Sequence, residues 1–118
     1  MAYDPFARGP FPAGVRTALL RDAARDERFL PIEVWYPADD AHAGVDVNPE
    51  TCDGYELVPG LPKVHQSAVR DAAPRAGRFP VVVFSHGFGG HRRQSTFLCS
   101  HLASHGYVVA SCDHTGNT

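Results

Sequence analysis

The clearest hydrophobic pattern in the chain lies in residues 78–90, R-F-P-V-V-V-F-S-H-G-F-G-G. The apolar run 81–84 is short and rich in β-branched side chains, which predicts a buried strand rather than a helix. A glycine-rich turn follows the run, then a helical pattern and a second apolar run at 107–112. This order predicts a βαβ unit over residues 79–112, with parallel strands and the turn at the carboxyl end of the first strand.

A helix is expected over residues 94–105, between the two strands. One broad face repeats at helical spacing and is expected to pack on the sheet. It consists of Phe97, Leu98, His101, Leu102 and His105. Gly106 supplies the left-handed residue that ends a helix of this kind.

Two further strands are expected earlier in the chain, over residues 14–22 and 29–36. The charged link between them predicts an antiparallel hairpin over residues 14–36. In the second strand Ile32, Val34 and Tyr36 fall on one face, opposite Glu33 and Trp35. Trp35 is expected to serve packing rather than binding. Residues 1–13 hold several prolines and glycines and are expected to lie as an arm across the surface.

Residues 38–77 show no long periodic pattern and predict an irregular excursion, with a short helix near residues 63–69. A connection of this length in a small domain is usually either a functional loop or disordered. Apolar residues favour an ordered excursion, because they give it something to bury. They are Tyr55, Leu57, Val58, Leu61 and Val64.

The composition fits one α/β domain over residues 1–118. A net charge of −2 gives no electrostatic reason to expect a nucleic-acid partner, and no apolar stretch is long enough for a transmembrane segment. The N-terminus has no pattern of a secretory signal. Cys52, Cys99 and Cys112, an odd number, fit reduced thiols, which predicts a cytoplasmic location; Cys99 and Cys112 are expected to be buried.

The glycine-rich turn S-H-G-F-G-G carries the candidate chemistry. Ester hydrolysis passes through an oxyanion that needs backbone N–H donors aimed at it. Glycine lets the chain turn tightly and leaves amides uncovered. The candidate donor is the N–H of Phe88, and Gly87 and Gly89 are the candidate substrate-binding residues that shape the loop. On these residues alone, a phosphate cradle or a plain turn stays open as an alternative.

Three sequence segments extend the motif beyond the glycine-rich turn: V-V-V-F-S-H-G-F-G-G, H-L-A-S-H-G-Y-V-V-A and C-D-H-T-G-N-T. Together with L-P-I-E-V-W-Y-P-A (30–38) and S-A-V-R-D-A-A-P (67–74), they resemble the α/β-hydrolases related to platelet-activating factor acetylhydrolase. Thr115 stands where that family often has proline. The resemblance implies the N-terminal part of an α/β-hydrolase fold, with an antiparallel hairpin, a long loop and a βαβ unit of a mostly parallel sheet. It also implies a Ser-His-Asp triad, no metal, no cofactor, and short-acyl or phospholipid-type ester substrates.

One departure from the family is large. The nucleophile of α/β-hydrolases lies in a G-x-S-x-G turn after this βαβ unit, and no G-x-S-x-G occurs here. By resemblance only Phe88 carries over, as an oxyanion-hole donor, and no triad residue does. The chain alone is therefore expected to be inactive. The alternatives are a non-enzymatic small α/β binding domain and a minimal enzyme that uses local residues or a partner's triad.

Ser85, His86, Asp113 and His114 are the residues from which a local triad could form. It is disfavoured, because the sequence shows no turn that would expose Ser85 and no base oriented toward it. Arg92 and Arg93, at the start of the helix, are expected to be solvated rather than to bind substrate. Asp113 is expected either to line the pocket or to serve a capping or turn role.

The histidines and Cys112 are the candidate ligands of a zinc site. His101 and His105 have i, i+4 spacing, and His86, His91 and His114 lie in the same part of the chain. No H-E-x-x-H and no C-x-x-C accompanies them, so no metal site is expected.

The strand over residues 80–85 is interior in the family arrangement. Here its outer side is expected to form an exposed, flat, apolar edge. Such an edge invites pairing with another chain. Self-association through residues 81–84 is therefore expected.

Overall fold

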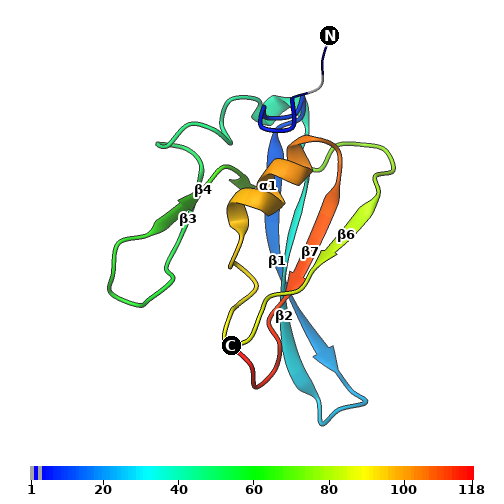
Figure 1. Cartoon of the computed structure of the whole chain (residues 1–118), viewed down its shortest axis with the longest axis vertical. Helices are drawn as coiled ribbons and strands as arrows, with labels where there is room; N and C mark the ends of the chain where they lie inside the picture. Colours follow the sequence, from blue (N-terminus) through cyan, green and yellow to red (C-terminus); the bar gives the residue numbers. More distant parts are fainter. Residues whose placement is uncertain (1, 3) are drawn as a thin grey trace.

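A computed structural model describes residues 2 and 4–118, and its centre is a five-stranded mixed sheet with one helix on one face (Figure 1). The strand order in the sheet is β5-β1-β2-β7-β6, and β3 and β4 form a separate pair. The elements are β1 (Ala13–Asp22), β2 (Arg28–Pro37), the 3-10 turn η1 (Asp40–His42), β3 (Asp53–Tyr55), β4 (Val64–Gln66), β5 (Val69–Arg70), β6 (Val81–Phe84), α1 (Thr96–Ser104) and β7 (Val108–Cys112).

The predicted hairpin and βαβ unit are both present. Strands β1 and β2 pair antiparallel from Ala13 opposite Pro37 to Asp22 opposite Arg28. Strand β7 pairs antiparallel with β2 on one side and parallel with β6 on the other. The antiparallel hairpin follows from the charged turn between two strand-like segments. The helical crossover between β6 and β7 follows from the helical spacing of apolar residues between two apolar runs.

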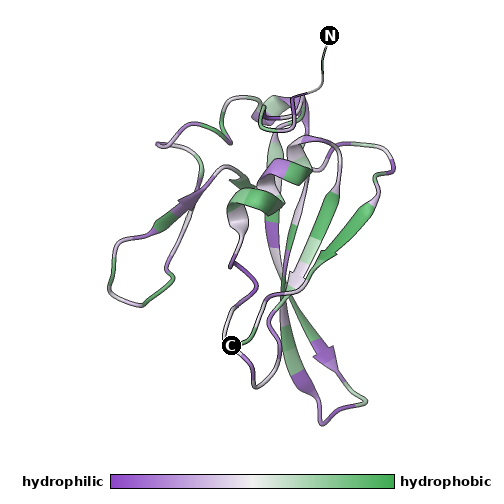
Figure 2. Cartoon of the chain, viewed as in Figure 1, coloured by the Kyte–Doolittle hydropathy of each residue, from purple (hydrophilic) through white to green (hydrophobic). Residues whose placement is uncertain are grey.

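Strand β6 occupies the edge of the sheet, so the expectation of a buried strand is wrong for half of its side chains. Val82 and Phe84 pack against the core cluster beneath α1. Val81 and Val83, which point to the other face, are 66% and 77% exposed. The expected exposed apolar edge is thus present, and Figure 2 shows β6 among the most hydrophobic strands of the sheet.

Helix α1 packs on the sheet through its small residues, not through the large apolar face expected from the sequence. Its buried residues are Cys99, Ser100, Ala103 and Ser104. Cys99 and Ala103 belong to one core cluster with Val15, Trp35 and Val109, and Leu102 packs at its margin. Small side chains let the helix backbone approach the strands closely, which is why this face is preferred over the bulky one.

Phe97 and Leu98 point away from the sheet, whereas Leu102 packs at the margin of the core, which corrects part of the predicted face. Phe97 is 76% exposed and Leu98 is 40% exposed. His101 Nε2 and His105 Nε2 lie 2.8 and 2.9 Å from backbone carbonyl oxygens of the N-terminal arm. The two histidines therefore hold the arm rather than pack in the core.

Gly106 ends α1 as the sequence predicts. Its φ of 103° is in the left-handed region. The Gly106 N–H donates to the Ala103 carbonyl at 3.1 Å, and the Tyr107 N–H donates to the Leu102 carbonyl at 3.2 Å. This pair of bonds is the Schellman arrangement, which satisfies carbonyls that the helix end would leave free.

The excursion between β2 and β6 is more regular than expected, and the helix predicted near residues 63–69 is absent. That segment forms β4 and β5 instead, because β4 pairs with β3 and β5 pairs parallel with β1. Tyr55 is buried, whereas Leu57, Val58, Leu61 and Val64 are exposed. Polar contacts hold the excursion where apolar burial was expected: the Trp35 Nε1–H, itself buried, donates to Gln66 Oε1 at 2.7 Å.

The N-terminal arm crosses the C-terminal half of α1, in line with its predicted surface path; residues 1 and 3 of the arm lie outside the described residues. The Gly9 N–H donates to Ser104 Oγ at 2.9 Å, and the Phe11 N–H donates to the Ser104 carbonyl at 3.0 Å. A Cβ atom at Gly9 would lie 2.1 Å from that carbonyl oxygen. Glycine is therefore required for this close approach.

The core position of Cys99 makes stability depend on pH. Burial raises the pKa of the Cys99 thiol from 9.0 to about 11. As pH rises through 9, the unfolded chain loses this proton while the folded chain keeps it, so stability falls between these two values. Urea unfolding at about pH 8 and about pH 10 should show a larger loss for the parent chain than for Cys99→Ala. Cys52→Ala, the control, should match the parent; equal losses in all three chains would contradict the prediction.

Candidate functional site

Two loops lie side by side at the carboxyl ends of the parallel strands β6 and β7. Residues 85–95 follow β6, and residues 113–118 follow β7 (Figure 1). Parallel strands bring their carboxyl ends to one edge of a sheet, which is where open α/β sheets bind their ligands. The first loop contains every predicted site residue, and the second proves to be its main support.

Phe88 lies at the protruding part of the first loop. Its side chain is 98% exposed, and no described residue accepts its backbone N–H. The Gly90 N–H donates to the Gly87 carbonyl at 2.9 Å, which closes a turn around Phe88. A Cβ atom at Gly87 or Gly89 would meet nothing within 4 Å, and Gly89 has a φ of 71°. The three predicted residues thus form an open turn in which the N–H groups of Gly87 and Phe88 have no acceptor among the described residues.

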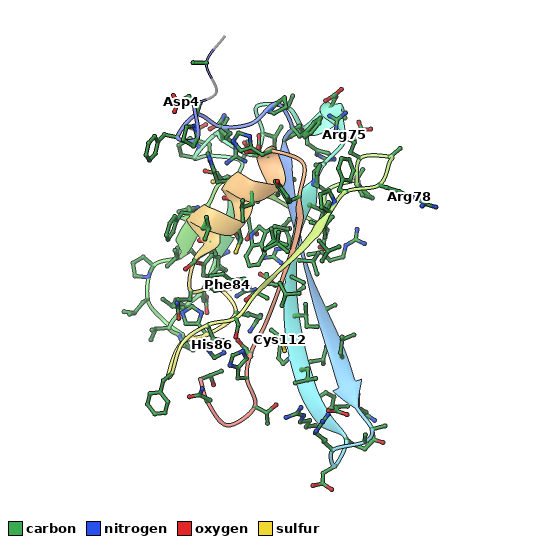
Figure 3. All side chains as sticks on the ribbon, turned by 45° about the vertical axis from the view of Figure 1, so that its right-hand side comes forward. Asp4, Arg75, Arg78, Phe84, His86 and Cys112 are labelled. Atoms are coloured by element: carbon green, nitrogen blue, oxygen red, sulfur yellow. The ribbon has the colours of Figure 1, made fainter. Side chains whose placement is uncertain are left out.

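His86 is buried at the base of this turn and is labelled in Figure 3. Its Nε2 accepts the backbone N–H of His114 at 3.0 Å. That bond requires an unprotonated Nε2, so the proton of the neutral ring lies on Nδ1, which is 2.8 Å from the Gly87 carbonyl oxygen. The His86 and His114 rings stack with centroids 3.8 Å apart. The two loops are therefore joined through one imidazole in a defined tautomer.

Ser85 has a base oriented toward it, contrary to the expectation from the sequence. Ser85 is exposed, and its Oγ lies 3.1 Å from His114 Nε2. Asp113 does not complete a triad with this pair. Its carboxylate accepts the Arg92 N–H at 2.6 Å and Arg92 Nη1–H at 2.7 Å. Asp113 therefore joins the loop after β7 to the loop after β6, a contact between the two loops rather than a cap or a local turn.

An apolar cavity of about 290 Å³ adjoins Ser85 and His114. Its lining includes Ile32, Val83 and Ala110. Trp35 and Val109 belong to the core cluster beneath α1, and Val82 packs against it. Successive side chains of a strand point to opposite faces, and each of the three lining residues is an odd number of positions from the core residue of its strand. The three lining residues therefore lie on the face of the sheet opposite α1.

A buried carboxylate, Glu33, anchors the polypeptide that follows the glycine turn. The Glu33 side chain has no exposed surface. Its Oε2 accepts Arg93 Nε–H at 2.7 Å and Arg70 Nη2–H at 3.1 Å, while Oε1 lies 3.8 Å from Arg92 Nε. The Thr17 hydroxyl also donates to Oε1. Arg92 and Arg93 are therefore ion-pair partners of acidic groups, and the expectation that they are solvated is wrong.

Arg70 extends this network to the excursion. It donates to both carboxylate oxygens of Asp53, at 3.0 and 2.8 Å. Burial alone would lower the pKa of Arg70, but the hydrogen bonds to Asp53 and Glu33 outweigh it and raise the pKa. Gln66 donates to Asp53 at 2.8 Å and accepts from Trp35, so the network ends in the core. Sequence reasoning missed this network because its members are far apart in the chain.

Neither a metal cluster nor a spanning helix occurs in the part of the chain that the structure describes. Within residues 2 and 4–118, no three side chains of His, Cys, Asp or Glu gather in a way that would hold a metal ion. The single α-helix of those residues is too short to cross a membrane.

One family model matches most of the chain, and curated relatives carry the same name. The family model described as platelet-activating factor acetylhydrolase, isoform II, matches residues 33–118. The chain is 27% identical over 127 residues to platelet-activating factor acetylhydrolase of Cavia porcellus and 27% identical over 125 residues to that of Gallus gallus, with 93% of this chain covered in both cases. The solved structure of ferulic acid esterase from Streptomyces cinnamoneus matches 88% of this chain with a TM-score of 0.65 and 31% identity.

The match to a solved esterase confirms the predicted fold class: a mixed sheet with one helix, as in the N-terminal portion of an α/β-hydrolase. The chain spans only part of each relative. It covers 28% of the Cavia porcellus protein, 30% of the Gallus gallus protein and 34% of the esterase chain.

The burial of Glu33 generates a stability prediction. Glu33→Gln keeps the shape of the side chain but removes the charge that faces three guanidinium groups. Breaking a buried ion pair in this way costs about 3–5 kcal/mol, so a large drop in the free energy of unfolding is expected, measured by urea denaturation. Glu27→Gln is the control, since its pair with Arg21 is exposed and worth about 1 kcal/mol or less. Equal midpoints for the two variants would contradict the prediction.

Proposed function

Because the chain belongs to the family of platelet-activating factor acetylhydrolase, isoform II, we propose that it is the N-terminal portion of a serine carboxylic-ester hydrolase and supplies its oxyanion-hole loop. The observation that carries the proposal is the uncommitted N–H of Phe88 on a turn at the carboxyl end of β6. The substrate class is a short-acyl or phospholipid-type ester. The relatives named as acetylhydrolases and as a ferulic acid esterase support an ester substrate.

The proposed chemistry needs only backbone groups from this turn. When a nucleophile attacks the ester carbonyl, negative charge develops on the carbonyl oxygen. The Phe88 N–H donates to that oxygen and lowers the energy of the tetrahedral intermediate. Gly87 and Gly89 leave open space on both sides of the donor, which lets the carbonyl approach. No metal ion or cofactor takes part in this proposal.

The nucleophile, acid and base are placed outside residues 1–118 in this proposal. The sequence contains no G-x-S-x-G, and the Ser85–His114 pair lacks a carboxylate because Asp113 bonds Arg92. A second candidate function is a non-enzymatic binding domain, which the apolar cavity beside Ser85 favours. The intact mass of the protein produced from its own gene separates the two. A mass well above 12.8 kDa supports the hydrolase, and a mass equal to this chain supports the binding domain.

Removing the proposed donor tests the hydrolase directly. Phe88→Pro deletes the backbone N–H, whereas Phe88→Ala keeps it and removes only the exposed ring. In the product of the complete gene, Phe88→Pro should lower kcat for p-nitrophenyl acetate about 10²–10³-fold, the usual cost of one oxyanion donor. Phe88→Ala should keep kcat near the parent value. Equal activity of the proline variant and the parent would refute the role of this amide.

The free edge of β6 generates a prediction about association. We propose that copies of the 118-residue chain pair through Val81–Phe84, since an exposed flat apolar edge templates strand pairing. Sedimentation velocity should show concentration-dependent association of the parent chain. Val83→Lys places a charge on the edge and should leave the chain monomeric, whereas Val47→Lys, at another exposed position, should not. A monomeric parent at all concentrations would contradict this proposal.

A further inference from the structure

We propose that residues 113–117 are a clamp that positions the oxyanion turn, with Asn117 as the positioning residue closest to Phe88. The inference rests on the proposed function of Phe88. It concerns how the donor is held in place rather than which atom donates.

Four side-chain contacts join the clamp to the turn. Ser85 Oγ lies 3.1 Å from His114 Nε2, and the His114 N–H donates to His86 Nε2 at 3.0 Å. Asp113 holds the backbone and the side chain of Arg92. The Gly89 N–H donates to Asn117 Oδ1 at 3.2 Å. The contacts fall before, beside and after Phe88, so each end of the turn has its own anchor.

The contact of Asn117 matters most, because packing does not hold the tip of the turn. The ring of Phe88 is almost fully exposed, and no atom lies within 4 Å of where a Cβ of Gly89 would be. Among the described residues, the bond from Gly89 to Asn117 is the one side-chain tether on the two residues at the tip. Loss of its acceptor should therefore release the peptide that carries the donor.

The position of Asn117 is itself fixed by a tight turn. The Asn117 N–H donates to the His114 carbonyl at 2.9 Å, and Gly116, third of the four turn residues, has a φ of 78°. Thr115, the second, has no positive φ, so the turn is type II, which favours glycine in the third position. His114 is stacked on buried His86, which ties this turn to the base of the loop.

The experiment compares Asn117→Ala, Asn117→Asp and Thr115→Ala. The alanine variant removes the acceptor, the aspartate variant keeps an acceptor oxygen, and Thr115→Ala is the matched control in the same turn. The first readout is amide hydrogen exchange of Gly89 in the 118-residue chain, expected to be about tenfold faster or more in Asn117→Ala only. The second is esterase kinetics of the complete gene product, where Asn117→Ala should lower kcat about 10–100-fold with KM unchanged, and Asn117→Asp should restore most of it.

The two readouts separate the possible failures. Unchanged exchange at Gly89 in Asn117→Ala overturns the clamp. Faster exchange with an unchanged kcat overturns the positioning role, as does an aspartate variant that is no better than alanine. A parent protein without esterase activity defeats the proposed function, while the exchange experiment still decides whether the clamp exists.

Discussion

The ion pairs of Glu33 are the constraint on which the site depends. A carboxylate with no exposed surface is tolerated only when charges and hydrogen bonds replace its water. Here Arg70 and Arg93 donate to it, and Arg92 lies close by. Because Arg92 and Arg93 follow the glycine turn after one intervening residue, the carboxylate in β2 fixes where that turn must end. Asp113 then extends the same charge network to the next loop.

The glycine-rich turn is held firmly at its base and lacks packing contacts at its tip. At its base, His86 is buried and both of its ring nitrogens have partners, which leaves the backbone little choice of position (Figure 3). At its tip, a Cβ at Gly87 or Gly89 would meet nothing within 4 Å, and the Phe88 N–H has no acceptor among the described residues. A donor that acts on a developing charge needs this combination, since it must be fixed before the reaction and unoccupied until then.

The parts that the sequence predicts correctly are those set by local pattern. Alternation and turn residues predict the hairpin, and Gly106 predicts the end of α1 by its backbone freedom alone. The parts missed depend on tertiary contacts. The packing face of α1 follows from how closely Cys99 and Ala103 approach the sheet, and the burial of Glu33 follows from three distant arginines. The spacing of residues along the chain predicts neither the packing face of α1 nor the burial of Glu33.

The Ser85–His114 contact was also missed by sequence reasoning, because it depends on tertiary structure. Both residues stand at the ends of neighbouring parallel strands, but their contact depends on β6 pairing directly with β7, which adjacency in sequence does not determine.

The sheet is covered by α1 on one face only, whereas strands of a parallel sheet normally bury both faces. An apolar cavity beside Ser85 and an exposed Val83 mark the uncovered face. A fixed donor such as the Phe88 amide stabilises developing charge more strongly in a site that excludes water than in water itself.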